Sequence, residues 1–217
     1  MKIKHAIYII ILVLFIDQFS KIYVKTNFFY GESVDILKWF KLTFIENEGM
    51  AWGTEIPGEY GKLFLTLFRI TAVVGIAYWL WESSVTKKKS KYLIVAISLI
   101  MAGALGNIID SVFYGVIFDK STPTHLASLF AENNYGTWFH GRVVDMFYFP
   151  IWHGFLPQWI PVYGGKEFTF FNAIFNVADF SISTGVGILI FFNKKAFDNT
   201  PANSTKPYLN NDLEENK

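Results

Sequence analysis

Cysteine is absent from this 217-residue sequence, and histidine is scarce. Without cysteine, the chain can form no disulfide, no thiolate metal site and no cysteine nucleophile. The four histidines are scattered and show no HExxH spacing, so the sequence carries no zinc-protease signature. The formal net charge is only +1, and this balance gives no indication of a nucleic-acid partner. We therefore expect neither a metal nor a cofactor.

Apolar residues are abundant instead, at 52% of the chain, and aromatic residues reach 19%. Ordinary globular chains are about 45–50% apolar even when glycine is counted. The apolar residues form four runs close to the ~20 residues that a membrane-spanning helix needs, at residues 5–24, 62–81, 92–113 and 172–192. The sequence thus predicts an all-α membrane protein with four transmembrane helices, in which residues 1–197 form a single domain.

Lysine placement predicts the orientation of these spans, because basic residues concentrate on the cytoplasmic side. Two lysines precede the first span, four lie within residues 87–91, and two more follow the last span at residues 194–195. Four spans place all three clusters on one side of the membrane. Both termini are then cytoplasmic, and the polar residues 198–217 are predicted to form a disordered cytoplasmic tail.

Both external loops carry structural signals. In the first, at residues 25–61, the alternation around Leu42 and Phe44 favours a short sheet. The second, at residues 114–171, contains the aromatic stretch YFPIWHGFLPQWIPVYGG, which is typical of the boundary between lipid headgroups and water. We expect both loops on the outer membrane surface, as a small extracytoplasmic β-sheet and an interfacial loop insertion.

Two carboxylates, Asp110 and Asp179, lie inside predicted spans, and each follows an asparagine by three residues. A charge in hydrocarbon costs at least a few kcal/mol, so an intramembrane carboxylate indicates a functional site. Each carboxylate lies on a predicted helical stripe. The stripes are Gly103, Asn107, Asp110 and Tyr114 on the third span, and Asn172, Asn176, Asp179 and Ser183 on the fourth. Small residues beside the first stripe, Gly103, Ala104 and Gly106, would let helices approach closely.

At a rise of ~1.5 Å per residue, five polar residues fall in the outer half of the bilayer: Asp17, Arg69, Asn107, Asp110 and Asp179. We interpret this layer as one site. Asp17 and Lys21 form either an ion pair whose lysine snorkels outward or a pair that faces substrate. Arg69 is predicted to be a structural counter-ion for Asp17 or Asp110. For Asp110 itself, a hydrogen bond between helices is favoured over a catalytic role.

Two aspartates that share one proton can hydrolyse a peptide bond, because the ionised member activates water while the protonated member polarises the carbonyl. From the residues alone, three aspartates compete as the partner of Asp179, namely Asp110, Asp119 and Asp145. Two other functions use the same polar groups. One is a small proton-coupled transporter with a carboxylate relay, and the other is an assembly subunit whose polar stripes bind helices together.

Five segments, in this order, resemble those of the lipoprotein signal peptidase (signal peptidase II) family. They are DQFSK at residues 17–21, NEGMAWG at 47–53, GALGNIID at 103–110, GRVVDM at 141–146 and FNVADFSIS at 175–183. The order of all five across four spans makes the resemblance specific.

The resemblance implies a four-helix aspartyl endopeptidase of the bacterial cytoplasmic (inner) membrane, with its active site at the outer leaflet and no cofactor. Such an enzyme removes the signal peptide from a diacylglyceryl-modified prolipoprotein, cleaving just before the lipid-modified cysteine. The implied catalytic pair is Asp145 and Asp179. Residues that match the family's substrate-binding or supporting positions are Asp17, Lys21, Asn47, Gly49, Asn107, Asp110 and Asn176. The implied partners are the prolipoprotein and membrane lipid, and we expect a monomer.

The sequence departs from the family pattern in two places. Many members have arginine directly after the aspartate of the third-span motif, where this chain has Ser111, and Arg142 is the candidate to replace it. An insertion at residues 119–140 also separates the third span from the catalytic segment. The stretch YGVIFD, which ends at Asp119, imitates GRVVD. Asp145 is preferred because Met146 and the residue after it continue the family pattern.

Overall fold

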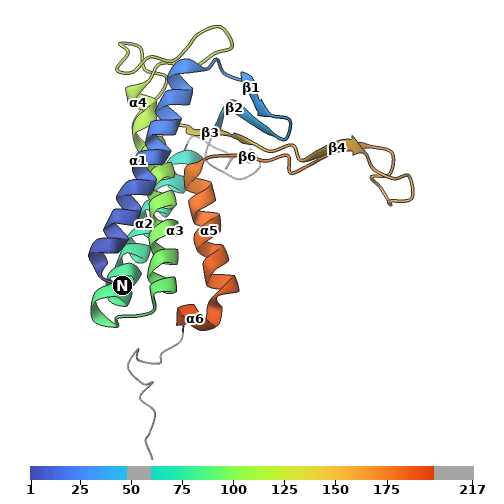
Figure 1. Cartoon of the computed structure of the whole chain (residues 1–217). Coiled ribbons are helices and arrows are strands. Elements are labelled where there is room, and N and C mark those ends of the chain that lie inside the picture. The colour runs from blue at the N-terminus through green and yellow to red at the C-terminus, as the bar shows by residue number, and fades with distance from the viewer. Residues whose placement is uncertain (48–59, 198–217) are drawn as a thin grey trace, which may run out of the picture.

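The computed structural model describes residues 1–47 and 60–197, and it shows four apolar helices side by side with a small sheet at one end (Figure 1). The helices are α1 (Ile3–Asn27), α2 (Gly61–Trp81), α3 (Lys91–Ile109) and α5 (Val177–Phe191). Single π-helical turns extend α2 through Glu82–Thr86 and α3 through Asp110–Tyr114. The latter leads into the short α4 (Gly115–Ile117), and α6 (Asn193–Phe197) follows α5.

Three of the helices are long and apolar enough to cross a membrane, over Ile3–Asn27, Gly61–Thr86 and Lys91–Ile117. The fourth apolar helix, α5, has 15 residues and is about 22 Å long at ~1.5 Å per residue, which is short of a ~30 Å hydrocarbon core. The fold is therefore mostly helical with added sheet, and its apolar helices give it the character of a membrane protein.

The prediction that the fourth helix begins at residue 172 is wrong. Residues before Val177 are extended, because β6 (Ile174–Phe175) pairs with the sheet and Asn176 then caps the helix. Asn172 consequently lies outside the helix and accepts a hydrogen bond from the Tyr148 hydroxyl at 3.0 Å. The predicted stripe on the fourth span therefore holds only from Asp179 onward, with Asn176 at the helix cap.

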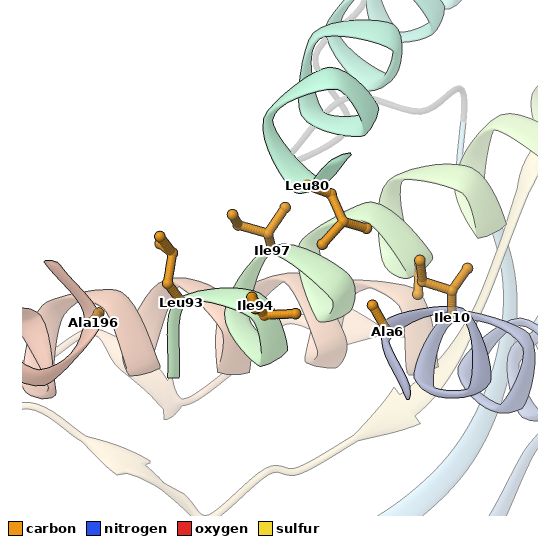
Figure 2. Packing of buried hydrophobic residues seen from close by; sticks show 8 residues of the cluster. Ala6, Ile10, Leu80, Leu93, Ile94, Ile97 and Ala196 are labelled. Carbon is orange, nitrogen blue, oxygen red and sulfur yellow. The ribbon is translucent and has the colours of Figure 1, made fainter. Parts of the chain in front are cut away.

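Helix α3 is the centre of the bundle and packs against α1, α2 and α5. Far from the sheet, Leu93, Ile94 and Ile97 of α3 meet Leu80 of α2 and Ala6 of α1 in a buried apolar cluster (Figure 2). The buried charged side chains of the bundle, by contrast, gather nearer the sheet, where Asp17 and Asp110 accept hydrogen bonds from the backbone of α5 and β3.

Close approach of the helices near the sheet depends on the glycines that the sequence indicated. A methyl group at Gly103 would overlap the carbonyl oxygen of Ala178 on α5. At Gly106 it would lie 2.5 Å from a carboxylate oxygen of Asp17 on α1. These two glycines therefore let α3 lie against both neighbours at the level where the polar groups meet.

The sheet has four antiparallel strands in the order β1, β2, β3 and β6. Strands β1 (Ser33–Leu37) and β2 (Phe40–Asn47) form a hairpin in the first loop, where a short sheet was expected, and β3 is Val143–Tyr148. Because β6 runs directly into α5, its pairing with β3 brings the start of α5 beside the middle of β3. This connection places Asp145 and Asp179 in one region.

Residues 119–140 fold back onto the sheet end of the bundle. Backbone N–H groups of Phe130, Tyr135 and Gly136 donate to carbonyls of residues 115–118 at 2.7–3.1 Å. Ala127 and Tyr135 join an apolar cluster with Val24, Phe44 and Phe118. The insertion is thus packed against α1 and β2.

A second hairpin, unexpected from the sequence, interrupts the chain between β3 and β6. Its strands are β4 (Trp152–Phe155) and β5 (Glu167–Phe170), which pair with each other and with no other strand of the described chain. Figure 1 shows this hairpin reaching sideways from the sheet, across the direction of the helices. We call residues 151–171 the aromatic arm.

Candidate active site

Asp145 lies at the centre of the sheet, on β3 opposite Ile45 of β2. The residue is only 2% exposed. The side-chain amide of Asn176 donates to its Oδ1 at 2.7 Å, and the amide of Asn47 donates to its Oδ2 at 3.3 Å. Each carboxylate oxygen of this buried aspartate therefore has an amide donor.

Asp179 belongs to the first turn of α5, where it forms a reciprocal cap with Asn176. The Asp179 backbone N–H donates to Asn176 Oδ1 at 2.9 Å, and the Asn176 backbone N–H donates to Asp179 Oδ2 at 3.3 Å. Asn107 of α3 donates to Asp179 Oδ1 at 2.9 Å. A carboxylate at a helix N-terminus is stabilised by the unpaired N–H groups there. Asn176 touches both aspartates, so one amide residue links β3 to α5.

Both carboxylates line the same cavity, whose volume is about 680 Å³. Asn47, Asn107 and Asn172 contribute amide groups to its wall, and Arg69 of α2 contributes a guanidinium. The remaining wall is apolar and continues along the helices through Phe68, Ala72, Val73, Ile76, Ala104 and Ile182. The cavity thus has a polar end at the two aspartates and an apolar groove along α2 and α5.

The electrostatics of the two aspartates are linked. Burial, followed by the charge of Asp179, raises the pKa of Asp145 to about 7. Hydrogen bonds from Asn47 and Asn176 act in the opposite direction by favouring the ionised form. Near neutral pH the pair can therefore hold one proton between two carboxylates, which is the state that acid–base hydrolysis requires.

Lys21 of α1 organises the polar layer behind this pair. Its Nζ lies 2.9 Å from Asp17 and 2.8 Å from Asp110, and it donates to Asn107 Oδ1 at 2.9 Å. The lysine is fully buried, so it does not snorkel outward. Since Asn107 in turn donates to Asp179, Lys21 fixes the orientation of the amide that holds one member of the pair.

Asp17 and Asp110 act on the backbone of the elements that carry the pair. Asp17 Oδ1 accepts the N–H of Ala178 in the first turn of α5 at 2.9 Å. Asp110 Oδ2 accepts the N–H of Val144, the neighbour of Asp145, at 3.3 Å. Gln18 donates to both carboxylates at 2.9–3.1 Å. Sequence reasoning missed Gln18, although its place beside Asp17 in DQFSK was a signal.

Arg69 is not the counter-ion of Asp17 or Asp110 that the sequence indicated. Those two carboxylates are paired with Lys21, whereas Arg69 lines the cavity and interacts electrostatically with Asp179. Arg142, the candidate replacement for an arginine at position 111, lies elsewhere. Its Nη1 is 3.5 Å from Glu46 Oε2, and it is absent from the cavity wall. Of these two arginines, the cavity wall includes Arg69 alone.

A second buried lysine, Lys25, lies one helical turn beyond Lys21 and was missed from the sequence. It pairs with Glu46 and donates to Ser121 of the insertion at 3.0 Å. The rings of Phe44, Phe118 and Tyr135 surround its ammonium group at 4.9–5.9 Å. The signal was the i, i+4 series of Asp17, Lys21 and Lys25 along one face of α1.

Asp119, the rival of Asp145, is placed in the insertion. Its carboxylate lies 2.8 Å from His125 and accepts the N–H of Ser128 at 2.7 Å. Hydrogen bonds from those two residues hold the pKa of Asp119 below its usual value despite an opposing effect of burial. It does not line the cavity. Gly49 lies outside the described residues. Within those residues, no three His, Asp or Glu side chains are grouped as a metal site.

An apolar helix bundle with a large cavity at its sheet end, lined by two electrostatically linked carboxylates, is typical of a membrane-embedded enzyme rather than a structural subunit. A bacterial membrane enzyme solved by the in meso method at 2.3 Å resolution has this fold. It matches with a TM-score of 0.61 and 25% identity, over 94% of this chain and 96% of that one.

Residues 9–193 match the family model described as "Signal peptidase (SPase) II", and the chain therefore belongs to the signal peptidase II family. A lipoprotein signal peptidase of Porphyromonas gingivalis is 48% identical over 184 residues, which cover 84% of this chain and 79% of that protein. One from Amoebophilus asiaticus is 37% identical over 188 residues, covering 84% and 74%. Family membership makes this chain a membrane protease of lipoprotein processing and removes the grounds for a transporter or an assembly subunit.

Proposed function

We propose that the chain is an aspartic endopeptidase in which Asp145 and Asp179 are the catalytic pair. The observation that carries this proposal is their common cavity, in which the charge of one carboxylate contributes to the raised pKa of the other. Asp179, held by the α5 N-terminus and Asn107, is the ionised member that activates water. Asp145, which is buried, is the protonated member that polarises the scissile carbonyl.

We further propose that the substrate is a diacylglyceryl-modified prolipoprotein, cleaved just before its lipid-modified cysteine. The relatives are lipoprotein signal peptidases by name, and the apolar groove suits such a substrate. Ile76 lies about 10 Å along α2 from Arg69 at ~1.5 Å per residue, so the groove leads from the aspartates toward the bilayer interior. An acyl chain or the apolar segment of a signal peptide fits this wall.

The orientation follows from the lysine pattern, with both termini cytoplasmic in a bacterial inner membrane and the aspartates at the outer leaflet. The lipid anchor holds the scissile bond at that surface, so a cavity beside the sheet is at the required depth. Residues 1–197 serve as a single domain that acts as a monomer. Asp17, Lys21, Asn47, Asn107, Asp110 and Asn176 support the pair, and Gly49 remains a substrate-binding proposal.

The test is cleavage of a lipidated precursor by Asp145→Asn and Asp179→Asn variants in detergent or bilayers. Each substitution removes one half of the acid–base pair, and we expect cleavage to fall about 10²- to 10⁴-fold while the protein remains folded. Asp119→Asn is the matched control, because it makes the same change in the imitating motif but outside the cavity. Its activity should stay within about tenfold of the unmodified protein. If Asp119→Asn were inactive and Asp145→Asn active, the catalytic partner of Asp179 would be Asp119 and not Asp145.

A further inference from the structure

The aromatic arm at residues 151–171 has no role in the proposed chemistry, and its composition is unusual. Seven of its 21 residues are Trp, Tyr or Phe. Several are strongly exposed, including Phe155 at 73%, Trp159 at 81% and Tyr163 at 60%. Exposed aromatic residues in such number leave a large apolar surface in water, unless another phase or molecule covers it.

These aromatic side chains are exposed although the aromatic arm is itself folded. The turn at residues 156–166 is held by its own backbone, because the Leu156 N–H donates to the Lys166 carbonyl at 2.9 Å and the Gly165 N–H donates to the Leu156 carbonyl at 2.9 Å. Gly164 also donates to Ile160 at 2.9 Å. The tip thus forms several backbone hydrogen bonds within itself while its aromatic side chains remain exposed, which lowers the cost of placing it beside lipid.

The position of the arm indicates what covers it. Figure 1 shows it extending sideways at the sheet end of the bundle, with its tip turned toward the level of the first turns of α5. Apolar side chains at the starts of two helices are exposed as well, namely Phe64 of α2 at 64% and Phe180 of α5 at 61%. The arm thus continues the lipid-facing surface of the bundle.

Charge argues for the same occupant. Lys166 and Glu167 are the only Asp, Glu, Lys or Arg residues of the arm, so their charges cancel. The Lys166 ammonium lies 5.2 Å from the Tyr163 ring centre, and Glu167 lies 3.0 Å from His153. A neutral surface rich in Trp and Tyr matches the headgroup boundary of a bilayer and needs no anionic lipid.

We propose that the aromatic arm is an interfacial membrane anchor, whose tip inserts into the headgroup region beside the cavity. The arm begins six residues after Asp145 and returns through Phe171 to the cavity wall and Asp179. Its anchoring therefore fixes the depth of the wall segment at residues 172–175 relative to the lipid. This proposal rests on the membrane character of the chain and stands whether or not the two aspartates are catalytic.

The absence of cysteine permits a direct test with a single thiol-linked fluorophore. Val162→Cys places the label at the tip, where the side chain is 79% exposed. Thr124→Cys, exposed in the insertion, is the matched control. In phosphatidylcholine nanodiscs we expect brominated lipid to quench the fluorophore at residue 162. We also expect iodide in the aqueous phase to quench this fluorophore at least about twofold less than the fluorophore at residue 124.

Two outcomes would overturn the anchor. Equal iodide access at 162 and 124 would leave the arm in water. Shielding from iodide without quenching by brominated lipid would place it against protein, as in contact with a second copy. A second variant, Trp159→Ser with Tyr163→Ser in the Val162→Cys background, should restore iodide access while cleavage in detergent stays unchanged. Continued lipid quenching in that variant, or loss of quenching at high salt, would exclude an aromatic anchor.

Discussion

Two buried lysines, four residues apart on α1, both pair with carboxylates but hold different parts of the molecule together. Lys21 lies between two carboxylates and an amide, and each of these groups is bonded to an element that carries a catalytic candidate. Lys25 lies against one carboxylate, a serine and three aromatic rings of the sheet and insertion. The first lysine connects helices to the site, whereas the second attaches the insertion to the C-terminal end of α1.

The difference lies in what remains when each lysine is removed. Without Lys21, the partners that Asp17 and Asp110 keep among residues 1–47 and 60–197 are neutral donors, namely Gln18 and backbone N–H groups. Without Lys25, Glu46 still has the Arg142 guanidinium at 3.5 Å and the Ser121 hydroxyl at 3.0 Å. A buried charge without a counter-charge is far more costly than one with a remaining partner. The Lys21 cluster should therefore be the more sensitive of the two.

Lys21→Met is the strongest test of this comparison. It leaves two buried carboxylates uncompensated and releases Asn107 from its lysine donor, so we expect a loss of about 3–5 kcal/mol in stability. Cleavage should fall as well, because Asn107 holds Asp179. Thermal unfolding in detergent and precursor cleavage measure the two effects. Wild-type stability in this variant would show that the Asp17–Lys21–Asp110 cluster is not what joins α1 to α3.

Lys25→Met is the matched substitution and should have a smaller effect. Glu46 keeps two partners and the methionine side chain can fill the aromatic enclosure, so we expect a loss of about 1–3 kcal/mol. Residual cleavage per folded molecule should remain near that of the unmodified protein. The comparison would fail if Lys25→Met lowered the melting temperature more than Lys21→Met did.

Asn47→Ala should produce the smallest change, and it concerns the proton of the pair. With one proton shared, cleavage falls as pH rises through the pKa of Asp145, which is about 7. The Asn47 amide favours the ionised form, so its removal raises this pKa further. We expect the alkaline limb of kcat/KM to move upward by less than about one pH unit. Ser33→Ala, which removes a hydroxyl contact to Thr43 on the same hairpin, should leave the limb unchanged.

Much of this architecture follows from the sequence because the bilayer restricts the choices. Apolar run length predicted the helices, and the Gly103 and Gly106 spacing predicted close packing, since only small residues permit it. The helix rise placed Asp17, Asn107 and Asp179 at one depth, and the structure links them through Lys21 and α5. The periodicity of a helix and the depth of its residues depend on that segment alone, so both could be predicted without knowing which other segments pack against it.

Features that depend on pairing between distant segments could not be predicted in this way. The sequence pattern assigned Asn176 to a helical stripe. In the structure, the preceding residues are extended because β6 pairs with β3, so the helix begins only after Asn176 and this residue is its N-cap. Asp145 could be distinguished from Asp119 only through the family resemblance, because strand register determines which carboxylate reaches the cavity. The hairpin of the aromatic arm was also missed, since aromatic composition indicates an interface without specifying strands.

The most direct test of the central claim is an infrared titration of the carboxylic-acid stretch between pH 5 and 9, with Asp145→Asn for band assignment. A protonated carboxyl band that disappears near pH 7, is missing in Asp145→Asn and titrates at lower pH in Asp179→Asn would show one proton held by two interacting aspartates. The account would be contradicted if Asp145 were already ionised at pH 5, or if its titration were unaffected by Asp179→Asn.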